Sequence, residues 1–556
     1  MSRLRKITLA VAAALALAGG LAWLYQDELL LRLVAIGADR RLPVGPSRPI
    51  DWERGPDPAG RPPGERPPNI VLILADDLGW NDLTVDGGGV ADGTVPTPSI
   101  DSIARDGIRF TSGYAANGTC APSRAALLTG RYGTRFGFEF TPTPPGMSTL
   151  VPRIANRMPG RLRPVVTQDA ESEELPFHEM GMPPSEITIA ELLQEAGYHT
   201  VHIGKWHLGG EHGMAPHEQG FDESLLMASG LYLPVDHPDT VNAPLDFDPI
   251  DRFLWRVLKF AASFNGGAAF EPAEYLTDYY TEQAVRVIEA NRERPFFLYL
   301  AHWAPHTPLQ ATRADYDALS HIEDHRLRVY AAMIRALDRG VGRVLEALRD
   351  NGLEDDTLVF FSSDNGAPGY IGLPDVNRPF RGWKITFFEG GIRVPYFVKW
   401  PARLPAGRSF DAPVHGFDFY ATAAAAAGAA LPADRPIDGV DLVPFVLGAR
   451  ESVPHRQLFW RTGHYQVALV DGWKLQVNER PPGGVWLFDL ESDPTEQTNL
   501  ADREPERVAA LRRLLAAHNA EQAASAWPSR VEMPVNLDKT LAEPDAPADP
   551  FIYWPN

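Results

Sequence analysis

Four short apolar runs along the chain each end in polar side chains. They are Ile70–Leu74, Val201–Ile203, Phe296–Leu300 and Leu358–Phe361. Continuous apolar runs of this length are typical of parallel strands that are buried on both faces of a sheet. A helical pattern over residues 189–196, with Thr188 and Glu191 as a capping box, precedes the second run. Together these features predict an α/β fold, with a large, mostly parallel central sheet flanked by helices, over residues 69–448.

The hydrophobic pattern changes in the last fifth of the chain. Four short strand candidates within residues 457–488 are separated by Gly, Asp and Pro, and the pair Asp471-Gly472 is a hairpin signal. An amphipathic helical pattern begins at Pro505. We therefore expect a smaller C-terminal α+β domain, with an antiparallel sheet and one helix, over residues 449–525.

Both ends of the chain differ in composition from the body. Basic residues precede an apolar run over residues 7–25, which is typical of an export signal and is also long enough to remain as a membrane anchor. Residues 26–68 are rich in Pro, Gly and Arg, which predicts a semi-stiff linker. Residues 526–556 are Pro-rich but end in apolar side chains, so we expect this tail to pack against the body.

We therefore expect the chain to be exported, with residues 1–25 either cleaved as a signal peptide or kept as an inner-membrane anchor. The chain has one cysteine and therefore no disulfide framework, which suits the bacterial periplasm or cell envelope. The net charge of −20 leaves no basic surplus to neutralise phosphates, so we expect no nucleic-acid partner. Membrane contact is expected only through the N-terminal segment.

Two of the strand candidates end in oxygen-rich pairs, Asp76-Asp77 and Asp364-Asn365. Ligands of open α/β sheets bind beyond the carboxyl ends of the strands. Carboxylate and amide oxygens are the ligands of a hard divalent cation such as Ca²⁺ or Mg²⁺. Either pair alone can equally be a solvated turn, because Asp and Asn favour loops. Two such pairs, both after apolar strands, favour a metal site.

The other two strand candidates lead into basic side chains. Lys205 and His207 follow one strand, and His302 and His306 follow the other. A hydrogen-bonded core or surface residue is the simpler interpretation of a single histidine. Their position at the same edge of the sheet as the acids makes them candidates for a catalytic site.

The single cysteine, Cys120, lies at the predicted start of a helix. Pro122 suits the first turn of that helix, and Gly130 would end it. The N-terminus of a helix favours an anion, and Arg124 in the first turn fits a position that faces one. An inert buried thiol and a thiolate nucleophile are the alternatives for Cys120.

At these residues the chain resembles the type I sulfatases of the alkaline phosphatase superfamily. Cys120 to Arg124 match the Cys-x-Pro-Ser-Arg signature of that family. Further matches follow in family order: Leu127–Gly130, Gly197–Gly209, Ala304–His306, Ser363–Gly366, Arg381–Lys384, Glu389–Pro395 and Asp493–Glu496. The resemblance implies an alkaline-phosphatase-like fold and a sulfuric ester hydrolase of the arylsulfatase type.

The resemblance also implies that Cys120 is oxidised to Cα-formylglycine by a formylglycine-generating enzyme. One hydroxyl of the hydrated aldehyde attacks sulfur, and the other remains to expel the product. The metal ligands implied are Asp76, Asp77, Asp364, Asn365 and the modified Cys120. Ca²⁺ is the implied ion, although oxygen ligands also admit Mg²⁺.

Roles for the basic residues are implied in the same way. Arg124 and Lys205 would hold the diol and offset its charge. His306 and Lys384 would bind the sulfate ester, and one of the two would protonate the leaving oxygen. His207 would act as the base that releases sulfate.

Two other functions compete with sulfate ester hydrolysis. A phosphonate or phosphate ester hydrolase of the same superfamily can share the modified cysteine and the metal site. Its last metal pair tends to be Asp-His, whereas this chain has Asp364-Asn365. A non-catalytic envelope binding protein is the other alternative, and the complete set of polar positions argues against it.

Two inserts, residues 140–184 and 231–275, are where we expect substrate choice to lie. The second insert contains Arg252–Phe260, which has the pattern of an amphipathic helix. This helix can form a lid over an aromatic pocket, touch a membrane or complete the core. From the negative net charge and this aromatic-rich insert we expect a small aryl- or alkyl-type sulfate ester as substrate, rather than a polyanionic polysaccharide.

Overall fold

The computed structural model describes residues 25–56, 66–144, 146–167, 175–481 and 483–556, together with residues 5, 7, 8, 17 and 20. Most of the predicted signal or anchor segment, residues 7–25, therefore lies outside the described residues, as does part of the predicted linker. Within the described part of the chain, no helix combines the length and the apolar character needed to span a bilayer.

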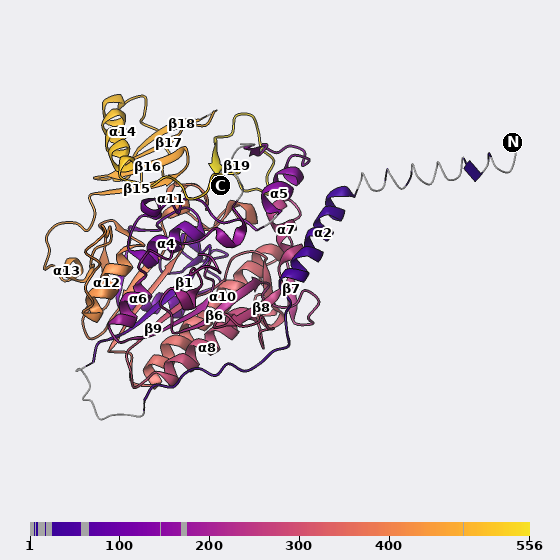
Figure 1. Cartoon of the computed structure of the whole chain (residues 1–556). Coiled ribbons are helices and arrows are strands. Elements are labelled where there is room, and N and C mark those ends of the chain that lie inside the picture. Colours follow the sequence, from indigo (N-terminus) through magenta and orange to yellow (C-terminus); the bar gives the residue numbers. More distant parts are fainter. Residues whose placement is uncertain are drawn as a thin grey trace.

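A nine-stranded sheet forms the centre of the molecule (Figure 1). In spatial order its strands are β13 (Arg408–Phe410), β2 (Ile108–Phe110), β12 (Tyr396–Lys399), β11 (Thr357–Ser363), β1 (Asn69–Ala75), β9 (Phe296–Ala301), β5 (His199–Gly204), β6 (Glu223–Gly230) and β8 (Phe260–Phe264). The five strands from β11 to β6 run parallel, and antiparallel pairs with β12 and β8 flank them. The predicted mostly parallel central sheet is confirmed.

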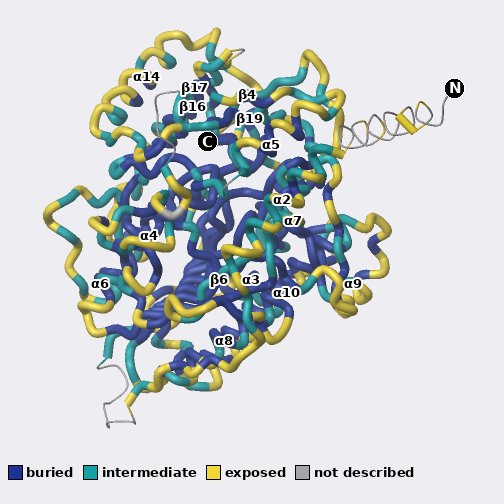
Figure 2. Tube along the Cα trace, turned by 45° about the vertical axis from the view of Figure 1, so that its right-hand side comes forward, coloured by how far each residue is buried: buried dark blue, intermediate teal, exposed yellow. Residues whose placement is uncertain are grey.

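Helices cover both faces of this sheet. One face carries α3 (Pro98–Arg105), α8 (Leu276–Ala290) and α10 (His325–Asp350), and the other carries α4 (Cys120–Thr129), α6 (Ile189–Glu195) and α12 (Asp418–Ala427). Alternate side chains of β1 enter two separate cores: Val71 and Ile73 face the first group, whereas Ile70, Leu72 and Leu74 face the second. The buried strands at the centre of Figure 2 reflect this arrangement, which explains why their sequences are apolar throughout.

The C-terminal region forms the predicted antiparallel sheet with one helix. Its strands are β15 (Gln457–Thr462), β16 (Tyr465–Val470), β17 (Trp473–Asn478) and β18 (Gly484–Asp489), followed by α14 (Pro505–Ala520). Asp471 and Gly472 both have positive φ, as a two-residue hairpin turn between β16 and β17 requires. Leu511 of α14 packs on Leu475 and Leu487 of this sheet. The boundaries at residues 448 and 525 stay predictions.

The C-terminal tail continues as two strands. β19 (Val531–Asn536) pairs with both β20 (Phe551–Pro555) and β4 (Val165–Val166). Since β4 belongs to the first predicted insert, the tail and this insert form one small sheet beside the carboxyl edge of the main sheet (Figure 1). The remaining strands and short helices are β3 (Gly113–Tyr114), β7 (Thr240–Asn242), β10 (Gln310–Thr312), β14 (Val414–His415), α9 (Arg313–Asp317), α11 (Glu389–Ile392), α13 (Val443–Val446), and 3-10 turns at Trp80–Asp82, Gly133–Phe136, Phe177–Glu179, Pro216–Glu218 and Gly369–Ile371.

Three helices from distant parts of the sequence pack together. They are α2 (Gln26–Arg41), α5 (Met147–Ala155) and α7 (Pro249–Val257). Leu31 of α2, Ile154 of α5 and Phe253 of α7 are buried in their shared apolar cluster. The linker predicted over residues 26–68 is therefore corrected for α2, because this segment is a helix whose Leu31 is buried against α5 and α7. The helix predicted over residues 252–260 instead ends at Val257, and Phe260 begins β8.

Candidate active site

The carboxyl ends of the central parallel strands bring the predicted polar residues together. Asp76 follows β1 and Asp364 follows β11, and the two strands are in register up to Ala75 and Ser363. Lys205 follows β5, and β9 leads into the segment that carries His306. Each of these strands is fixed by its buried apolar side chains, so the polar groups at their ends are held in place by the core.

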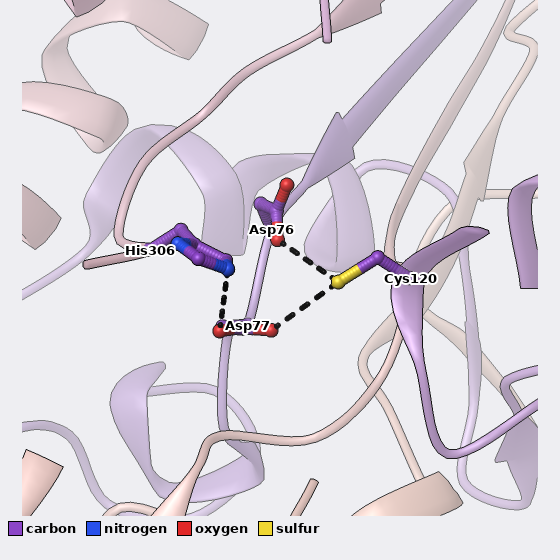
Figure 3. A group of neighbouring side chains, drawn as sticks. All are labelled: Asp76, Asp77, Cys120 and His306. Atoms are coloured by element: carbon purple, nitrogen blue, oxygen red, sulfur yellow. Dashed lines mark hydrogen bonds and ion pairs between the residues drawn. The ribbon is translucent and has the colours of Figure 1, made fainter. Parts of the chain in front are cut away.

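Cys120 is the first residue of α4 and is buried, with 3% of its surface exposed. Its Sγ lies 3.6 Å from Asp76 Oδ1 and 3.9 Å from Asp77 Oδ1 (Figure 3). Burial raises the pKa of this thiol, and the carboxylate of Asp364 raises it further. An unmodified Cys120 is therefore a poor thiolate nucleophile, which argues against one of the alternatives from the sequence.

Arg124, one turn further along α4, is fully buried among protein groups. Its Nη2 donates to Asp76 Oδ2 at 2.9 Å and lies 2.8 Å from Asp364 Oδ2, to which Nε also donates. Its Nη1 contacts the Tyr299 hydroxyl and the backbone carbonyl of Lys205, each at 3.2 Å. The guanidinium thus joins the carboxylates that follow β1 and β11, and fixes their orientation.

Asp77 is the centre of a second group of contacts and has a positive φ of 63°. Lys384 Nζ lies 2.7 Å from Asp77 Oδ1 and 2.9 Å from Oδ2. Asn365 Nδ2 donates to Asp77 Oδ1 at 2.7 Å, and the Tyr370 hydroxyl donates to Oδ2 at 3.2 Å. Although burial lowers it, the pKa of Lys384 is well above its usual value because of Asp77, so this lysine is charged.

Lys205 and His306 both contact the indole ring of Trp303. Lys205 Nζ is 2.6 Å from Asp76 Oδ2 and 4.6 Å from the centre of the Trp303 ring, on which the His306 imidazole stacks at 3.8 Å. His306 Nδ1 is 2.6 Å from the carbonyl oxygen of Thr307, so that nitrogen donates, and Nε2 faces Lys384 and Asp77 (Figure 3). Burial and Lys384 hold the pKa of His306 well below its usual value, so its imidazole is neutral.

His207 lies in the same cavity as Cys120. Its φ is 65°, in the left-handed region, and its buried Nδ1 has no hydrogen-bond partner among the described residues. Burial, with Lys205 and Arg124 adding to it, lowers the pKa of His207 well below the usual value. A neutral imidazole with an unoccupied nitrogen can accept a proton, and its backbone geometry fits a site under functional constraint.

The acidic residues of the site fit a divalent cation. The nearest ligand atoms of Asp76, Asp77, Cys120 and His306 all lie within 4.8 Å of one another. The buried Oδ1 of Asn365 has no partner in the described part of the chain, as expected of an oxygen that is reserved for a ligand. His306 Nε2 lies 3.2 Å from Lys384 Nζ, so this nitrogen is not free to bind a metal ion. The remaining ligand atoms include carboxylate and amide oxygens, which a hard cation prefers.

A cavity of about 260 Å³ opens above these residues. Cys120, Lys205, His207, His306 and Lys384 form its polar floor. Apolar side chains from α5, α7, β19 and β20, with Pro142, Pro144, Leu258 and Ile385, form much of its wall. Ten of the eleven candidates from the sequence therefore belong to one site, because they either line the floor of this cavity or contact residues that do. The eleventh, His302, is fully buried and does not line the cavity.

Sequence reasoning did not identify three aromatic residues of the site and the apolar wall. Trp303, Tyr299 and Tyr370 contact Lys205, Arg124 and Asp77, respectively. Trp303 immediately precedes the Ala304–His306 motif, and this position could have indicated it. The wall carries no such signal, because its segments are remote from the motifs in the sequence.

Comparison with known proteins places this site in a family. A family model described as Sulfatase matches residues 68–429, more than half of the chain. The chain belongs to the sulfatase family. The N-acetylgalactosamine-6-sulfatase of Canis lupus familiaris is 35% identical over 422 residues, which cover 74% of this chain and 72% of that protein. The steryl-sulfatase of Mus musculus is 33% identical and covers 74% and 70%, respectively.

A solved structure shares the fold. The crystal structure of Ps i-CgsB superposes with a TM-score of 0.68 at 30% identity, over 83% of this chain and 95% of that chain. The family assignment and these relatives identify the chain as a sulfuric ester hydrolase. The family resemblance read from the sequence motifs is thereby confirmed.

Proposed function

We propose that this sulfatase hydrolyses the sulfate ester of an aryl- or alkyl-type alcohol, with formylglycine at position 120 and a bound divalent cation. Water and the ester, ROSO₃⁻, yield the alcohol and hydrogen sulfate. The observation that carries this proposal is the position of Cys120. It lies against the carboxylates of Asp76 and Asp77, on the floor of a cavity that also exposes Lys205 and Lys384.

Asp76, Asp77, Asp364 and Asn365 would hold the cation together with modified residue 120. A bound Ca²⁺ supplies a Lewis acid that polarises sulfate oxygens, and Mg²⁺ is the alternative with the same donor set. The three carboxylates face three cationic side chains, Arg124, Lys205 and Lys384. Adding a divalent cation to this balanced set would leave the floor positive, as an anionic ester requires.

Oxidation of Cys120 by a formylglycine-generating enzyme would supply a hydrated aldehyde with one hydroxyl for attack and one for release. Lys205 and Lys384 are placed to bind anionic oxygens on the cavity floor. The Nδ1–H of His306 donates to the Thr307 carbonyl, so His306 Nε2 carries no hydrogen. At the contact between the two side chains, Lys384 Nζ is therefore the donor and His306 Nε2 the acceptor. One of this pair protonates the leaving oxygen, and His207 Nδ1 accepts a proton during sulfate release.

Arg124 has a different part in this proposal from the one that the resemblance implies. Its guanidinium donors contact Asp76, Asp364, Tyr299 and the Lys205 carbonyl. We therefore place Arg124 as a positioning residue for the carboxylates.

Mass spectrometry of the peptide that contains residue 120 tests the proposal. The protein is produced with a formylglycine-generating enzyme and assayed with matched aryl sulfate, phosphate and phosphonate esters. We expect the aldehyde at position 120, fastest turnover of the sulfate, and no turnover by Cys120→Ala. Full activity with an unmodified thiol would contradict the mechanism, and faster turnover of the phosphonate would favour the competing hydrolase.

Chelation tests the cation separately. Dialysis against EGTA is expected to lower both the activity and the melting temperature, and Ca²⁺ is expected to restore them, because a ligand of the folded state stabilises it. Asn365→Ala should weaken Ca²⁺ binding in calorimetry. A wild-type protein that binds neither Ca²⁺ nor Mg²⁺ would contradict the metal assignment.

Export to the periplasm or cell envelope is proposed from the sequence alone, on the basic residues and the apolar run at residues 7–25. Cell fractionation of the full chain and of a variant without residues 1–25 tests it. We expect only the full chain to leave the cytoplasm.

A further inference from the structure

We propose that the alcohol part of the substrate is an extended, uncharged hydrocarbon, and that the inner face of α7 is the subsite that selects it. This inference rests on the proposed sulfate ester hydrolysis and specifies its substrate. The ester would be an amphiphile, with one sulfate group on the cavity floor and an apolar alkyl or fused-ring body along the wall.

One face of α7 and its C-terminal end contributes a row of apolar side chains to the cavity. Ile250, Leu254 and Leu258 are spaced four residues apart, and all three line the cavity. Met147 and Val151 of α5 repeat the same spacing on the adjoining wall. Two helices therefore present regular apolar faces to the space directly above the sulfate site.

The wall is completed by the C-terminal tail. Val531 and Met533 of β19 and Trp554 of β20 line the same cavity as α5 and α7. β19 is held in place by pairing with β20 on one side and β4 on the other. Segments separated by several hundred residues thus converge on this wall, as expected of a preformed binding site.

The distribution of charge in the cavity matches an amphiphilic anion. Among the described lining residues, the Lys and His side chains are those of the floor: Lys205, His207, His306 and Lys384. The other polar side chains of the lining are uncharged: Thr119, Thr141, Thr143, Ser148, Tyr370 and the Asn556 amide. A sulfated sugar would bring many hydroxyls, and often further anionic groups, to a wall with few partners for them, at the cost of their desolvation.

The size of the cavity fits more than one aromatic ring. An apolar cavity of about 150 Å³ binds benzene, and the cavity here measures about 260 Å³. A smaller hollow of about 100 Å³ adjoins it and shares Ile250, Met533 and Trp554. Arg161, Asp248, Lys539 and Asp545 also line this hollow, so the apolar subsite is the main cavity.

The α7 wall is supported from behind. Phe253 is fully buried against α2 and α5, and Asp248 caps the first turn by accepting from the backbone N–H groups of Ile250 and Asp251. A wall held in this way is preorganised, so apolar contacts with substrate cost little ordering of the protein.

Hydrolysis of linear alkyl sulfates, below their micellar concentrations, tests the inference. The substrates are butyl, hexyl and octyl sulfate, with p-nitrophenyl sulfate and N-acetylgalactosamine 6-sulfate for comparison. Burial of one methylene group contributes a free energy equivalent to about a fourfold change in binding. We expect kcat/KM to rise by about this factor for each added methylene, and the sugar sulfate to be the poorest substrate.

Substitutions in the cavity wall distinguish a loss of apolar binding from a general loss of activity. Leu254→Asp should lower the ratio of kcat/KM for octyl over butyl sulfate by about tenfold or more, because the chain would meet a carboxylate. Met147→Gln is a second wall variant that should lower the same ratio. Leu514→Asp places the same charge on an exposed position of α14 and should leave the ratio unchanged.

The outcomes distinguish this inference from the proposed function. Turnover of p-nitrophenyl sulfate without any dependence on alkyl length, or faster turnover of the sugar sulfate, would overturn the apolar subsite alone. Failure of an enzyme with formylglycine at position 120 to hydrolyse any of these sulfate esters would overturn both. An unchanged octyl-to-butyl ratio in both wall variants would remove α7 and α5 from substrate selection.

Discussion

At the scale of single residues, the site depends on how buried charges are paired. Burial raises the pKa of Asp76, but the charges of Lys205 and Arg124 outweigh this effect and hold the pKa below its usual value. Removing one partner of a buried pair leaves the other charge without compensation, which costs more than the pair itself contributes. The cationic residues therefore have both a structural and a chemical part in the site.

Lys384 provides the first prediction. Its Nζ contacts both Asp77 and His306, so Lys384→Ala should lower kcat/KM for an aryl sulfate by roughly 10²–10³. Lys384→Arg should not restore activity, because a planar guanidinium does not replace a compact ammonium. Steady-state kinetics measures both, with circular dichroism to confirm folding. Activity of Lys384→Ala near that of the wild type would contradict the assignment.

Asp82 provides a prediction about pH. The buried carboxylate accepts from the Gly79 N–H at 2.7 Å and the Tyr330 hydroxyl at 2.6 Å, and burial raises its pKa from 3.8 to about 7. Between these values the folded state binds more protons than the unfolded state. The stability from this group is therefore fully present below about pH 4 and lost as the pH rises through about 7.

The measurement is urea unfolding between about pH 5 and pH 8. Asp82→Asn should reduce the fall in the free energy of unfolding over this range, because an amide keeps an acceptor and does not titrate there. Asp92→Asn, at an exposed position, serves as the control and should leave the fall unchanged. An equal fall in the wild type and Asp82→Asn would contradict the prediction.

At the scale of elements, the three-helix group of α2, α5 and α7 connects the N-terminal part of the chain to the cavity wall. Asp27 of α2 pairs with Arg153 and Arg157, and Glu28 pairs with Arg256 of α7. These ion pairs are partly exposed and contribute little on their own. The buried side chains between the helices should therefore determine how firmly α7 is held.

Leu31 tests this view of α2. It is 1% exposed, so Leu31→Ala should destabilise the packing by about 2–4 kcal/mol. Because local opening can occur without global unfolding, the measurement is hydrogen exchange of the α2 and α7 amides. Leu33→Ala is the matched control on the same helix, since Leu33 is 64% exposed. Equal exchange in the two variants would show that α2 does not support α7.

At the scale of the whole molecule, a buried charge cluster joins the C-terminal sheet to the catalytic core. Lys474 of β17 lies 2.7 Å from Glu389 Oε1 and 3.0 Å from Glu496 Oε1, and all three side chains are fully buried. Tyr114 donates to Glu389 at 3.0 Å, which ties the cluster to the catalytic core. Glu389 and Glu496 belong to two of the family motifs, so these motifs have a structural part here.

Removal of the central cation gives the prediction at this scale. Lys474→Met should lower the free energy of unfolding by about 3–5 kcal/mol, because the buried Glu496 would lose its cationic partner while Arg393 still pairs with Glu389. Lys539→Met is the control: Lys539 pairs with Asp549 at a partly exposed position, so its loss should cost at most about 1 kcal/mol. Urea unfolding measures both, and equal losses would contradict the interpretation.

Much of the fold and the polar site could be predicted because local patterns carry them. Apolar runs such as Ile70–Leu74 define buried strands, and parallel strands place the residues after their carboxyl ends at one edge of the sheet. The partners of Arg124 could not be read in this way. Its position at a helix start suggested an external anion, whereas the fold supplies the anions from Asp76 and Asp364.

The sequence by itself determined the α/β class, the C-terminal sheet, the family motifs and the position of Cys120 at the start of a helix. These features depend on residues that are close together in the chain. Only the tertiary structure decided that α2 is a helix, that Lys474 joins two motifs, and that Leu254, Met147 and Met533 share one cavity. Such contacts join segments separated by up to several hundred residues, and packing between distant segments leaves no periodic signal in either of them.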